Sequence, residues 1–191
     1  MMEYEAKVIF IGDSNVGKTC IIKRCTSNEF LENATPTLSS NYSLISIKTA
    51  EFNIRIQFWD TAGDEKYRSI VPMFYRGSQA AVIVYSIDDR KTFQDIDYFI
   101  ESLKANLDFD SLALFLIANK LDLEDRTVTA LEGEEKAKSI NATFMEVSAK
   151  NGENISEFVN MIAIEINEKK KMRKSEKLHL NQNQQTNDIC C

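Results

Sequence analysis

The sequence has only one histidine, no long apolar run and no signal pattern, and each of these absences excludes a class of protein. Its single histidine, His179, lies in a polar stretch, which rules out a serine–histidine triad, and the sequence carries no histidine–cysteine cluster for a metal. No apolar run approaches the roughly 20 residues that a transmembrane helix needs. The first six residues carry two acidic side chains and no basic-then-apolar signal pattern, so we expect a cytosolic protein.

The sequence also has few cysteines and fewer basic than acidic residues. Of the four cysteines, Cys20 and Cys25 lie in one short segment and the other two end the chain. The sequence therefore predicts no disulfide framework, and free thiols suit a reducing compartment. The formal net charge of -6 argues against a nucleic-acid partner, because phosphate binding needs a basic surface. A basic cluster at residues 169–174 is the exception.

What is present is the composition of one globular domain with a tail. The 191 residues are 43% hydrophobic and 27% charged, which suffices for one domain with a substantial core. From Ser175 onward the chain turns polar and has nothing to bury, which is typical of disorder. We therefore expect a domain over residues 1–172 and a disordered tail over residues 173–191.

Short apolar runs alternate along the chain with stretches of helical spacing. The runs lie at residues 8–11, 81–85, 112–118 and 144–147. Such an alternation indicates an α/β fold with a mostly parallel sheet that helices cover on both faces. Residues 53–58 alternate strictly between polar and apolar side chains, and with residues 44–47 they predict a hairpin that supplies an antiparallel edge strand.

A glycine-containing segment follows the first apolar run. Residues 12–19 read Gly-Asp-Ser-Asn-Val-Gly-Lys-Thr and match the phosphate-loop pattern G-x-x-x-x-G-K-[ST]. Its backbone N–H groups can converge on phosphate oxygens, with Lys18 on the β- and γ-phosphates and the Thr19 hydroxyl on a magnesium ion. A turn that matches by chance is the alternative, and the motif alone leaves the base and the reaction open. The expected nucleotide contacts here are Asp13, Ser14, Asn15, Val16, Gly17, Lys18, Thr19 and Cys20.

Two further segments indicate which base is bound. Residues 119–122 read Asn-Lys-Leu-Asp and residues 148–150 read Ser-Ala-Lys, and each follows an apolar run, at the edge where an open parallel sheet binds ligands. Asp122 can accept hydrogen bonds from N1–H and the exocyclic amine of guanine, which adenine does not offer. Another base would leave a buried carboxylate unpaired, so the sequence favours guanine.

The order of these segments carries a family resemblance. With Asp-Thr-Ala-Gly at residues 60–63 between them, they resemble a Ras-superfamily GTPase, and within it a Rab protein, over about residues 4–166. Residues 72–81 are similar to the early-endosomal branch. The resemblance implies a three-layer α/β P-loop GTPase domain with a six-stranded, mostly parallel sheet, one antiparallel edge strand and about five flanking helices. Further Rab-like signatures are residues 59–63, residues 75–77, Cys190 and Cys191.

The resemblance assigns roles around the phosphates of bound GTP or GDP. Thr37 would complete the Mg²⁺ shell beside Thr19 only when the γ-phosphate is present, and Asp60 would hold the ion through water. Gly63 would donate its amide to the γ-phosphate. The groups nearest to hydrolysis would then be Lys18, Gly63 and Asp64.

The resemblance also assigns the base contacts and the partner surface. Asn119 and Lys120 would brace the pocket beside Asp122 and Ser148, while Ala149 donates its amide to the base oxygen and Lys150 packs on the ring. Tyr42, Trp59 and Phe74 match the aromatic triad through which Rab proteins contact effectors; ordinary packing is the alternative. The other implied partners are an exchange factor, a GTPase-activating protein and the prenylation escort and dissociation factors.

Asp64 departs from the family pattern, which has glutamine at this position. A glutamine amide both accepts and donates hydrogen bonds around the attacking water, whereas an ionised aspartate is shorter and only accepts. The sequence therefore predicts slow intrinsic hydrolysis and a long-lived GTP state. The alternative is that activating proteins of the TBC type supply an arginine and a glutamine in trans. Ser39 is a second departure, and with Thr35 nearby it makes the register of the Thr37 loop less certain.

The C-terminal residues resemble a membrane device. Double-cysteine ends in Rab proteins are geranylgeranylated on both residues, so Cys190 and Cys191 would anchor the protein to the cytosolic face of intracellular vesicles, with a cytosolic pool. The basic cluster at residues 169–174 would add attraction to anionic lipids, or would merely solvate a helix end. Two other functions stay in view: a P-loop kinase, and a GTP-locked scaffold that recruits effectors.

Overall fold

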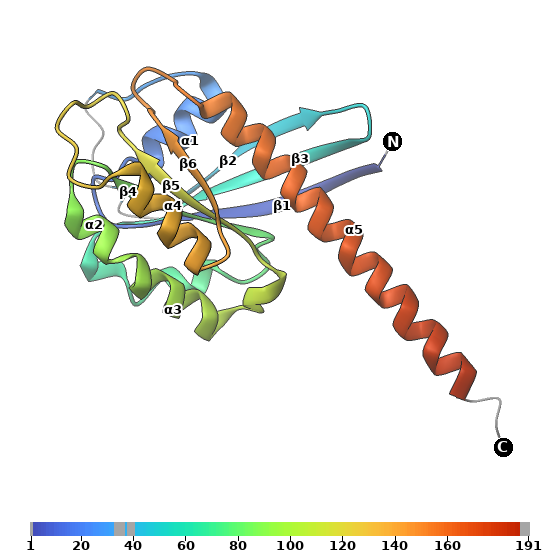
Figure 1. Ribbon diagram of the computed structural model, residues 1–191. Helices are drawn as coiled ribbons and strands as arrows, with labels where there is room; N and C mark the ends of the chain where they lie inside the picture. The colour runs from blue at the N-terminus through green and yellow to red at the C-terminus, as the bar shows by residue number, and fades with distance from the viewer. Residues whose placement is uncertain (1, 33–36, 38–40, 188–191) are drawn as a thin grey trace.

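A six-stranded sheet with helices on both faces makes up the domain (Figure 1). The structure is a computed structural model that describes residues 2–32, 37 and 41–187. The strands are β1 (Met2–Ile11), β2 (Asn41–Lys48), β3 (Phe52–Asp60), β4 (Ala80–Ser86), β5 (Ala113–Asn119) and β6 (Thr143–Val147). The helices are α1 (Lys18–Ser27), α2 (Arg90–Gln94), α3 (Ile96–Asn106), α4 (Ala130–Ser139) and α5 (Ile155–Asn187), with 3₁₀ turns η1 (Glu65–Tyr67), η2 (Val71–Phe74) and η3 (Phe109–Ser111).

The sheet topology confirms the predicted fold class. The strand order is β2-β3-β1-β4-β5-β6, with β2 antiparallel to β3 and the other neighbouring pairs parallel. β2 is thus the antiparallel edge strand that the alternating pattern predicts. Every residue of β4 and of β5 is buried, as expected for central parallel strands that helices cover on both faces.

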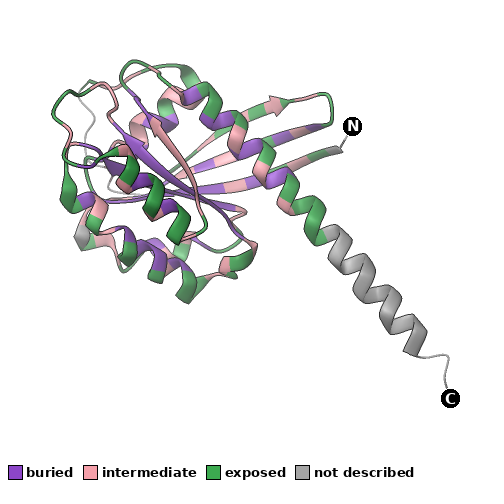
Figure 2. Ribbon diagram, in the orientation of Figure 1, coloured by how far each residue is buried: buried purple, intermediate pink, exposed green. Residues whose placement is uncertain are grey.

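Two hydrophobic cores, one on each face of the sheet, hold the three layers together. On the face that α1 and α5 cover, the Phe10 ring makes edge-to-face contacts with Phe58 and Phe158 at centroid distances of 5.4 Å and 6.2 Å. On the other face, Ile100 and Leu103 of α3 pack in a separate cluster. Figure 2 shows buried residues concentrated along the central strands and on the helix faces that meet them. Full burial of each such side chain stabilises the fold by about 1.5–3 kcal/mol.

The strand register aligns the predicted functional segments at one edge of the sheet. Phe10 of β1 pairs with Asp60 of β3, which sets the end of β3 beside the loop that follows β1. Asn119 of β5 pairs with Ser86 of β4 and with Val147 of β6. The segments that follow β1, β3, β5 and β6 therefore open at the same carboxyl edge, where open α/β sheets bind ligands.

The last helix differs from the expectation of a disordered tail. α5 continues to Asn187, so the backbone of residues 175–187 is helical (Figure 1). Seven of the 13 residues in this stretch are the good helix formers glutamine, leucine, lysine and glutamate, and none is glycine or proline, so a helix nucleated by the packing of Phe158 and Ile162 can extend through it. The division between residues 172 and 173 stays a prediction. Despite the length of α5, none of the described helices is apolar enough to cross a membrane.

Candidate functional site

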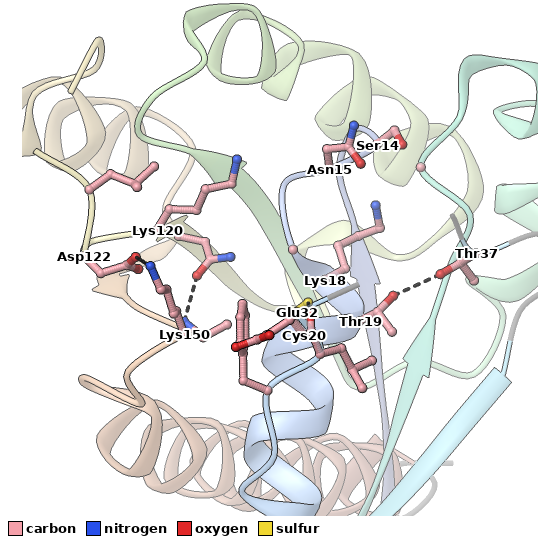
Figure 3. A pocket seen from close by; sticks show the side chains of 17 residues that line it. Ser14, Asn15, Lys18, Thr19, Cys20, Glu32, Thr37, Lys120, Asp122 and Lys150 are labelled. Atoms are coloured by element: carbon pink, nitrogen blue, oxygen red, sulfur yellow. Dashed lines mark hydrogen bonds and ion pairs between the residues drawn. The ribbon is translucent and has the colours of Figure 1, made fainter. Parts of the chain in front are cut away.

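The predicted segments meet in one cavity of 330 Å³ at the carboxyl edge of the sheet (Figure 3). Asp13, Val16, Asp60 and Ser148 do not line it but lie directly behind its wall, where they contact lining residues. Ser39 and Thr35 lie outside the described residues. The cavity is lined by Ser14, Asn15, Gly17, Lys18, Thr19, Cys20, Phe30, Leu31, Glu32, Thr37, Gly63, Asn119, Lys120, Asp122, Leu123, Ala149 and Lys150.

The phosphate loop turns tightly around this cavity. Gly17 has a φ of 94°, and a β-carbon there would lie 2.2 Å from the side-chain nitrogen of Asn119, so only glycine fits. Asn15 also has a positive φ of 63°, which asparagine tolerates better than most residues. Because α1 begins at Lys18, the N–H groups of its first turn have no partner within the helix and, with the positive end of the helix dipole, favour an anion.

Lys18 is a buried cation in the floor of the cavity. Its ammonium donates to the carbonyl oxygens of Gly12 at 2.8 Å and Asp13 at 2.7 Å. Burial lowers the pKa of Lys18 to about 8, although Asp60 and Asp13 act in the opposite direction. Gly63 lies against this ammonium, because a β-carbon there would be 2.4 Å from Lys18 Nζ. A desolvated cation beside bare backbone suits a strongly anionic ligand.

Three oxygen-bearing side chains converge beside Lys18. The Thr19 hydroxyl donates to Asp60 Oδ2 at 2.6 Å and lies 2.9 Å from the Thr37 hydroxyl, which is 3.3 Å from the same carboxylate oxygen. Asp60 Oδ1 is buried and has no hydrogen-bond partner among the described residues. Burial raises the pKa of Asp60, while Thr19, Lys18 and Thr37 lower it. These hard oxygens, one of them without a partner, fit Mg²⁺.

For a Mg²⁺ ion, the chain provides two hydroxyl groups and one carboxylate, which is fewer ligands than a complete coordination shell of protein oxygens. Within the described residues, histidine, cysteine, aspartate and glutamate form no group of three or more that could hold a metal. A hard cation at Thr19, Thr37 and Asp60 would need further oxygens from a bound ligand, which is how Mg²⁺ usually accompanies phosphates.

Asn119 joins the two halves of the cavity. Its side-chain nitrogen donates to the carbonyl oxygen of Val16 in the phosphate loop at 2.8 Å. Its side-chain oxygen accepts the N–H of Ala149 at 3.1 Å. The side chain is buried and both its nitrogen and its oxygen are hydrogen-bonded, so it bridges the phosphate loop and the segment at residues 148–150.

The far end of the cavity presents the Asp122 carboxylate. The Ser148 hydroxyl donates to one of its oxygens. Lys150 Nζ lies 3.8 Å from the other oxygen, on the same side of the pocket (Figure 3). Lys120 lies opposite, with its ammonium 3.3 Å from Asp88. The structure thus brings the predicted base contacts together around one acid. Guanine recognition by them stays a prediction.

Sequence reasoning missed an arginine that supports this end of the site. Arg24 of α1 donates to the carbonyl oxygens of Ala149 at 2.9 Å, Lys150 at 2.7 Å and Asn28 at 2.7 Å. It therefore ties the base segment to the end of α1. No local pattern signals such a contact, because Arg24 and Ala149 are far apart in the sequence.

Four lining residues were also missed by the sequence motifs. Phe30 and Leu31 follow α1 and form part of the wall, and Glu32 and Leu123 complete it. Phe30 and Leu31 are adjacent apolar residues outside any predicted helix or strand. Apolar side chains in a loop have no evident place in the core, so their presence there could have indicated a ligand-binding wall.

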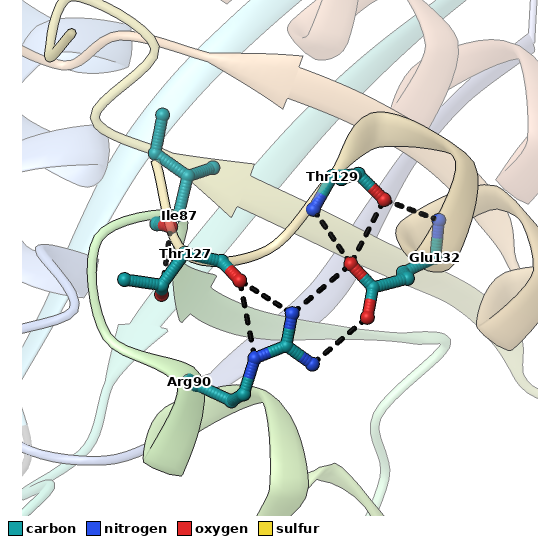
Figure 4. A network of polar contacts seen from close by, with 5 residues as sticks. All are labelled: Ile87, Arg90, Thr127, Thr129 and Glu132. Carbon is teal, nitrogen blue, oxygen red and sulfur yellow. Dashed lines mark hydrogen bonds and ion pairs between the residues drawn. The ribbon is translucent and has the colours of Figure 1, made fainter. Parts of the chain in front are cut away.

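A polar network behind the base end holds two loops together (Figure 4). Arg90 at the start of α2 donates to the carbonyl oxygen of Thr127 and pairs with Glu132 at 2.8 Å. Thr129 and Glu132 form a capping box at the start of α4. The N–H of Thr127 donates to the carbonyl oxygen of Ile87 at 2.8 Å. The loop after β4 and the loop that follows Asp122 are therefore fixed to each other.

Asp64 turns its carboxylate toward its own chain. One oxygen accepts the N–H of Lys66 at 2.9 Å, and the other lies 3.8 Å from the Lys66 ammonium. The Asp64 carbonyl also accepts the N–H of Tyr67 at 2.9 Å, which closes the η1 turn. Asp64 therefore caps this turn immediately after Gly63, with a side chain that is 39% exposed.

Tyr42, Trp59 and Phe74 form one continuous aromatic face. The rings of Tyr42 and Trp59 are stacked with centroids 5.4 Å apart, and Trp59 lies 6.2 Å from Phe74. Tyr42 is 51% exposed. Trp59 and Phe74 are partly buried, and Trp59 also packs against the core on the α3 face of the sheet. The role of the three rings in partner binding stays a prediction.

The fold and the site together define the class of this protein. A phosphate loop after β1, oxygen ligands beside it and an amide–carboxylate site at the same sheet edge are the features of a P-loop nucleotide-binding protein. A model of the Ras family matches residues 7–168. The chain therefore belongs to the Ras family of small GTPases.

The most similar proteins found are named as Ras-related proteins. SEC4 of Saccharomyces cerevisiae is 37% identical over 166 residues, which cover 85% of this chain and 75% of that protein. RabC of Dictyostelium discoideum is 33% identical over 190 residues, 97% of this chain and 96% of that protein. Rab-5B of Dictyostelium discoideum is 38% identical over 157 residues, which cover 82% of this chain and 72% of that protein. The predicted likeness to Rab proteins is confirmed, whereas the early-endosomal likeness stays a prediction, because SEC4 and Rab-5B match almost equally.

Proposed function

We propose that this chain is a Rab-type switch that alternates between GDP and GTP states and recruits effector proteins in vesicle trafficking. The observation that carries the proposal is the single cavity in which Asn119 joins a phosphate loop to the Asp122 carboxylate. Likeness to RabC over almost the whole chain supports the same function. The phosphate half would accept any nucleotide. The Asp122 carboxylate, whose side chain is 13% exposed, would favour guanine, because guanine offers two N–H donors to it and adenine does not.

The phosphate end would work through this chain's own groups. Lys18 would leave its two carbonyl acceptors for β- and γ-phosphate oxygens, and the Gly63 N–H would donate to the γ-phosphate. Thr19, Thr37 and Asp60 would hold Mg²⁺. Mg²⁺ held by these side chains would supply positive charge that offsets the negative charge of the phosphates. Because Thr37 belongs to a separate loop, its contact would register whether the γ-phosphate is present.

Asp64 is the basis for proposing slow intrinsic hydrolysis. Its carboxylate accepts the N–H of Lys66 and, when ionised, has no proton to donate toward phosphate. It also adds negative charge beside a polyanion. A water molecule attacking the γ-phosphate would therefore be poorly oriented, so the GTP state would be long-lived.

A second candidate is a GTP-locked scaffold that binds effectors and hardly turns over. The contact that favours it is the engagement of Asp64 with its own turn, which removes the side chain from catalysis. An activating protein that supplies an arginine and a glutamine in trans would restore hydrolysis. We prefer the cycling switch because Lys18 lies against Gly63 and the side chains of Thr19, Thr37 and Asp60 contact one another, an arrangement that would suit GTP and Mg²⁺.

We propose two further contact regions for the switch. Effectors would dock on Tyr42, Trp59 and Phe74, while an exchange factor and a GTPase-activating protein would act at the nucleotide site. Cys190 and Cys191, which lie outside the described residues, would carry geranylgeranyl groups delivered by escort factors. The protein would then occupy the cytosolic face of intracellular vesicles, with a cytosolic pool.

We propose a structural role for the basic cluster, different from the expected solvation of a helix end, because α5 continues to Asn187 and the lysines contact the rest of the domain. Lys169 donates to the carbonyl oxygens of Asp110 and Leu112, and Lys171 pairs with Glu51 at 3.0 Å. Lipid attraction would compete with these contacts. We therefore assign the cluster to securing α5 against the domain.

The base assignment is tested with Asp122→Asn. The variant loses the carboxylate that accepts from guanine, so GDP should bind about a hundredfold more weakly, from two charged hydrogen bonds of about 1.5 kcal/mol each. Xanthosine diphosphate, which carries a carbonyl in place of the amine, should bind better than it does to the unmodified protein. Both affinities are measured by titration of fluorescent nucleotides. Asp125→Asn, an exposed acid in the same loop, is the control; unchanged GDP affinity in Asp122→Asn would contradict the assignment.

A further inference from the structure

Arg68 lies between the phosphate loop and the start of α3. Its Nη2 nitrogen is 2.6 Å from Asp13 Oδ1 and 2.6 Å from Asp95 Oδ2. Asp13 belongs to the phosphate loop, and Asp95 is the residue between α2 and α3. One guanidinium therefore connects three segments that are separate in the sequence.

This ion cluster is sheltered from solvent. The side chains of Arg68, Asp13 and Asp95 are 22%, 12% and 23% exposed. The guanidinium carbon lies 4.7 Å from the centre of the Tyr98 ring, a cation–π contact. Burial raises the pKa of Asp13, which Arg68 opposes. Removing the arginine would leave two sheltered carboxylates near each other, and breaking such a cluster costs more than losing a surface ion pair.

Asp13 also contacts the two groups that face the γ-phosphate. Its carbonyl oxygen accepts from Lys18 at 2.7 Å, and a β-carbon on Gly63 would lie 2.5 Å from that same oxygen. The backbone of Asp13 thus touches Gly63, while its side chain holds Arg68. The stretch from Gly63 to Arg68, which follows β3, therefore contacts the phosphate loop at both of its ends.

The stretch between these attachments is a single tight turn. The N–H of Tyr67 donates to the carbonyl oxygen of Asp64, and η1 fills the space between Asp64 and Arg68. This turn links Arg68 to Asp64 and, through it, to Gly63.

We propose that Arg68 is a positioning residue for GTP hydrolysis, which holds the stretch from Gly63 to Arg68 against the phosphate loop by bridging Asp13 and Asp95. The inference rests on the proposed function, because it concerns the rate of that reaction. Arg68 does not touch the nucleotide in this scheme; it fixes the distance between Gly63 and the γ-phosphate. A shift of about 1 Å in such a group can slow a reaction by about a hundredfold.

The test compares Arg68→Ala, Arg68→Lys and Asp95→Asn in the full-length chain loaded with GTP and Mg²⁺. We expect Arg68→Ala to slow single-turnover phosphate release by about tenfold while GDP dissociation changes less than about twofold. Arg68→Lys keeps a cation and should recover part of the rate. Asp95→Asn should lower the rate in the same direction but less, and it decides the question if Arg68→Ala does not fold.

The control is Arg55→Ala, which removes an exposed pair with Glu5 elsewhere on the sheet and should leave phosphate release unchanged. Equal phosphate release in Arg68→Ala and the unmodified protein would overturn the inference. So would parallel changes in release and GDP dissociation, because these indicate general loosening of the site. If the unmodified protein neither binds nor hydrolyses GTP, the proposed function itself fails, and this inference fails with it.

Discussion

Replacing Asp64 by glutamine should accelerate intrinsic GTP hydrolysis. The Asp64 carboxylate follows Gly63, which packs against the Lys18 ammonium, so its charge lies close to the expected γ-phosphate. One such charge pair at about 5 Å and an effective dielectric near 20 costs about 3 kcal/mol. Because the side chain is 39% exposed, solvent screening leaves roughly 1 kcal/mol, or about fivefold in rate. A glutamine amide that orients water adds to this, so we expect about tenfold in all.

The assay is single-turnover phosphate release from protein loaded with GTP and Mg²⁺. Asp64→Asn separates the two causes, since it removes the charge without the reach of glutamine. If repulsion dominates, asparagine gives most of the acceleration, and added salt speeds the unmodified protein more than either variant. Glu51→Gln removes one exposed charge at the turn between β2 and β3 and should change nothing. An unchanged or slower rate in Asp64→Gln would refute the reasoning, and the GTP-locked scaffold or a compensated Asp64 would have to replace it.

Two other predictions concern stability and the membrane. The pKa of Glu132 is lowered to about 2 by hydrogen bonds from Arg90 and Thr129, so its stabilising effect is complete above the unfolded value near 4.5 and is lost as the pH falls toward about 2. The gap in Tm between the unmodified protein and Glu132→Gln should therefore narrow as the pH falls from about 5 to about 2 in thermal melts, and a constant gap would contradict the assignment. Replacing Cys190 and Cys191 by serine should leave GDP affinity unchanged and move the protein from membranes to cytosol on cell fractionation, whereas persistent membrane binding would refute lipid anchoring.

The parts of this molecule that follow from local pattern were predictable from the sequence. The phosphate loop requires glycine at Gly17 because a side chain would collide with Asn119, so the loop can be recognised from its sequence pattern. The hairpin of β2 and β3 shows in the strict alternation of residues 53–58. The meeting of separate segments at one edge follows from the parallel strand order.

Contacts between distant segments were not predictable in this way. Arg24, Arg68 and Arg90 read as ordinary surface arginines, yet each binds a segment far away in the sequence. Their partners are often backbone carbonyls, which carry no residue-type signal. The helical backbone from Ser175 to Asn187 was missed for another reason. A polar composition shows that a segment has little to bury, but it does not show whether a helix that began earlier in the chain continues through it.

The two hydrogen bonds of Asn119 make the base site and the phosphate site thermodynamically dependent on each other. One amide holds Val16 on one side and Ala149 on the other, so ordering either segment restricts the other. A ligand that fills only one half, such as guanosine or pyrophosphate, contacts only one of the two segments that Asn119 joins. The affinity of the intact nucleotide should therefore exceed what the two fragments together would suggest, and exchange of the bound nucleotide can begin at either end.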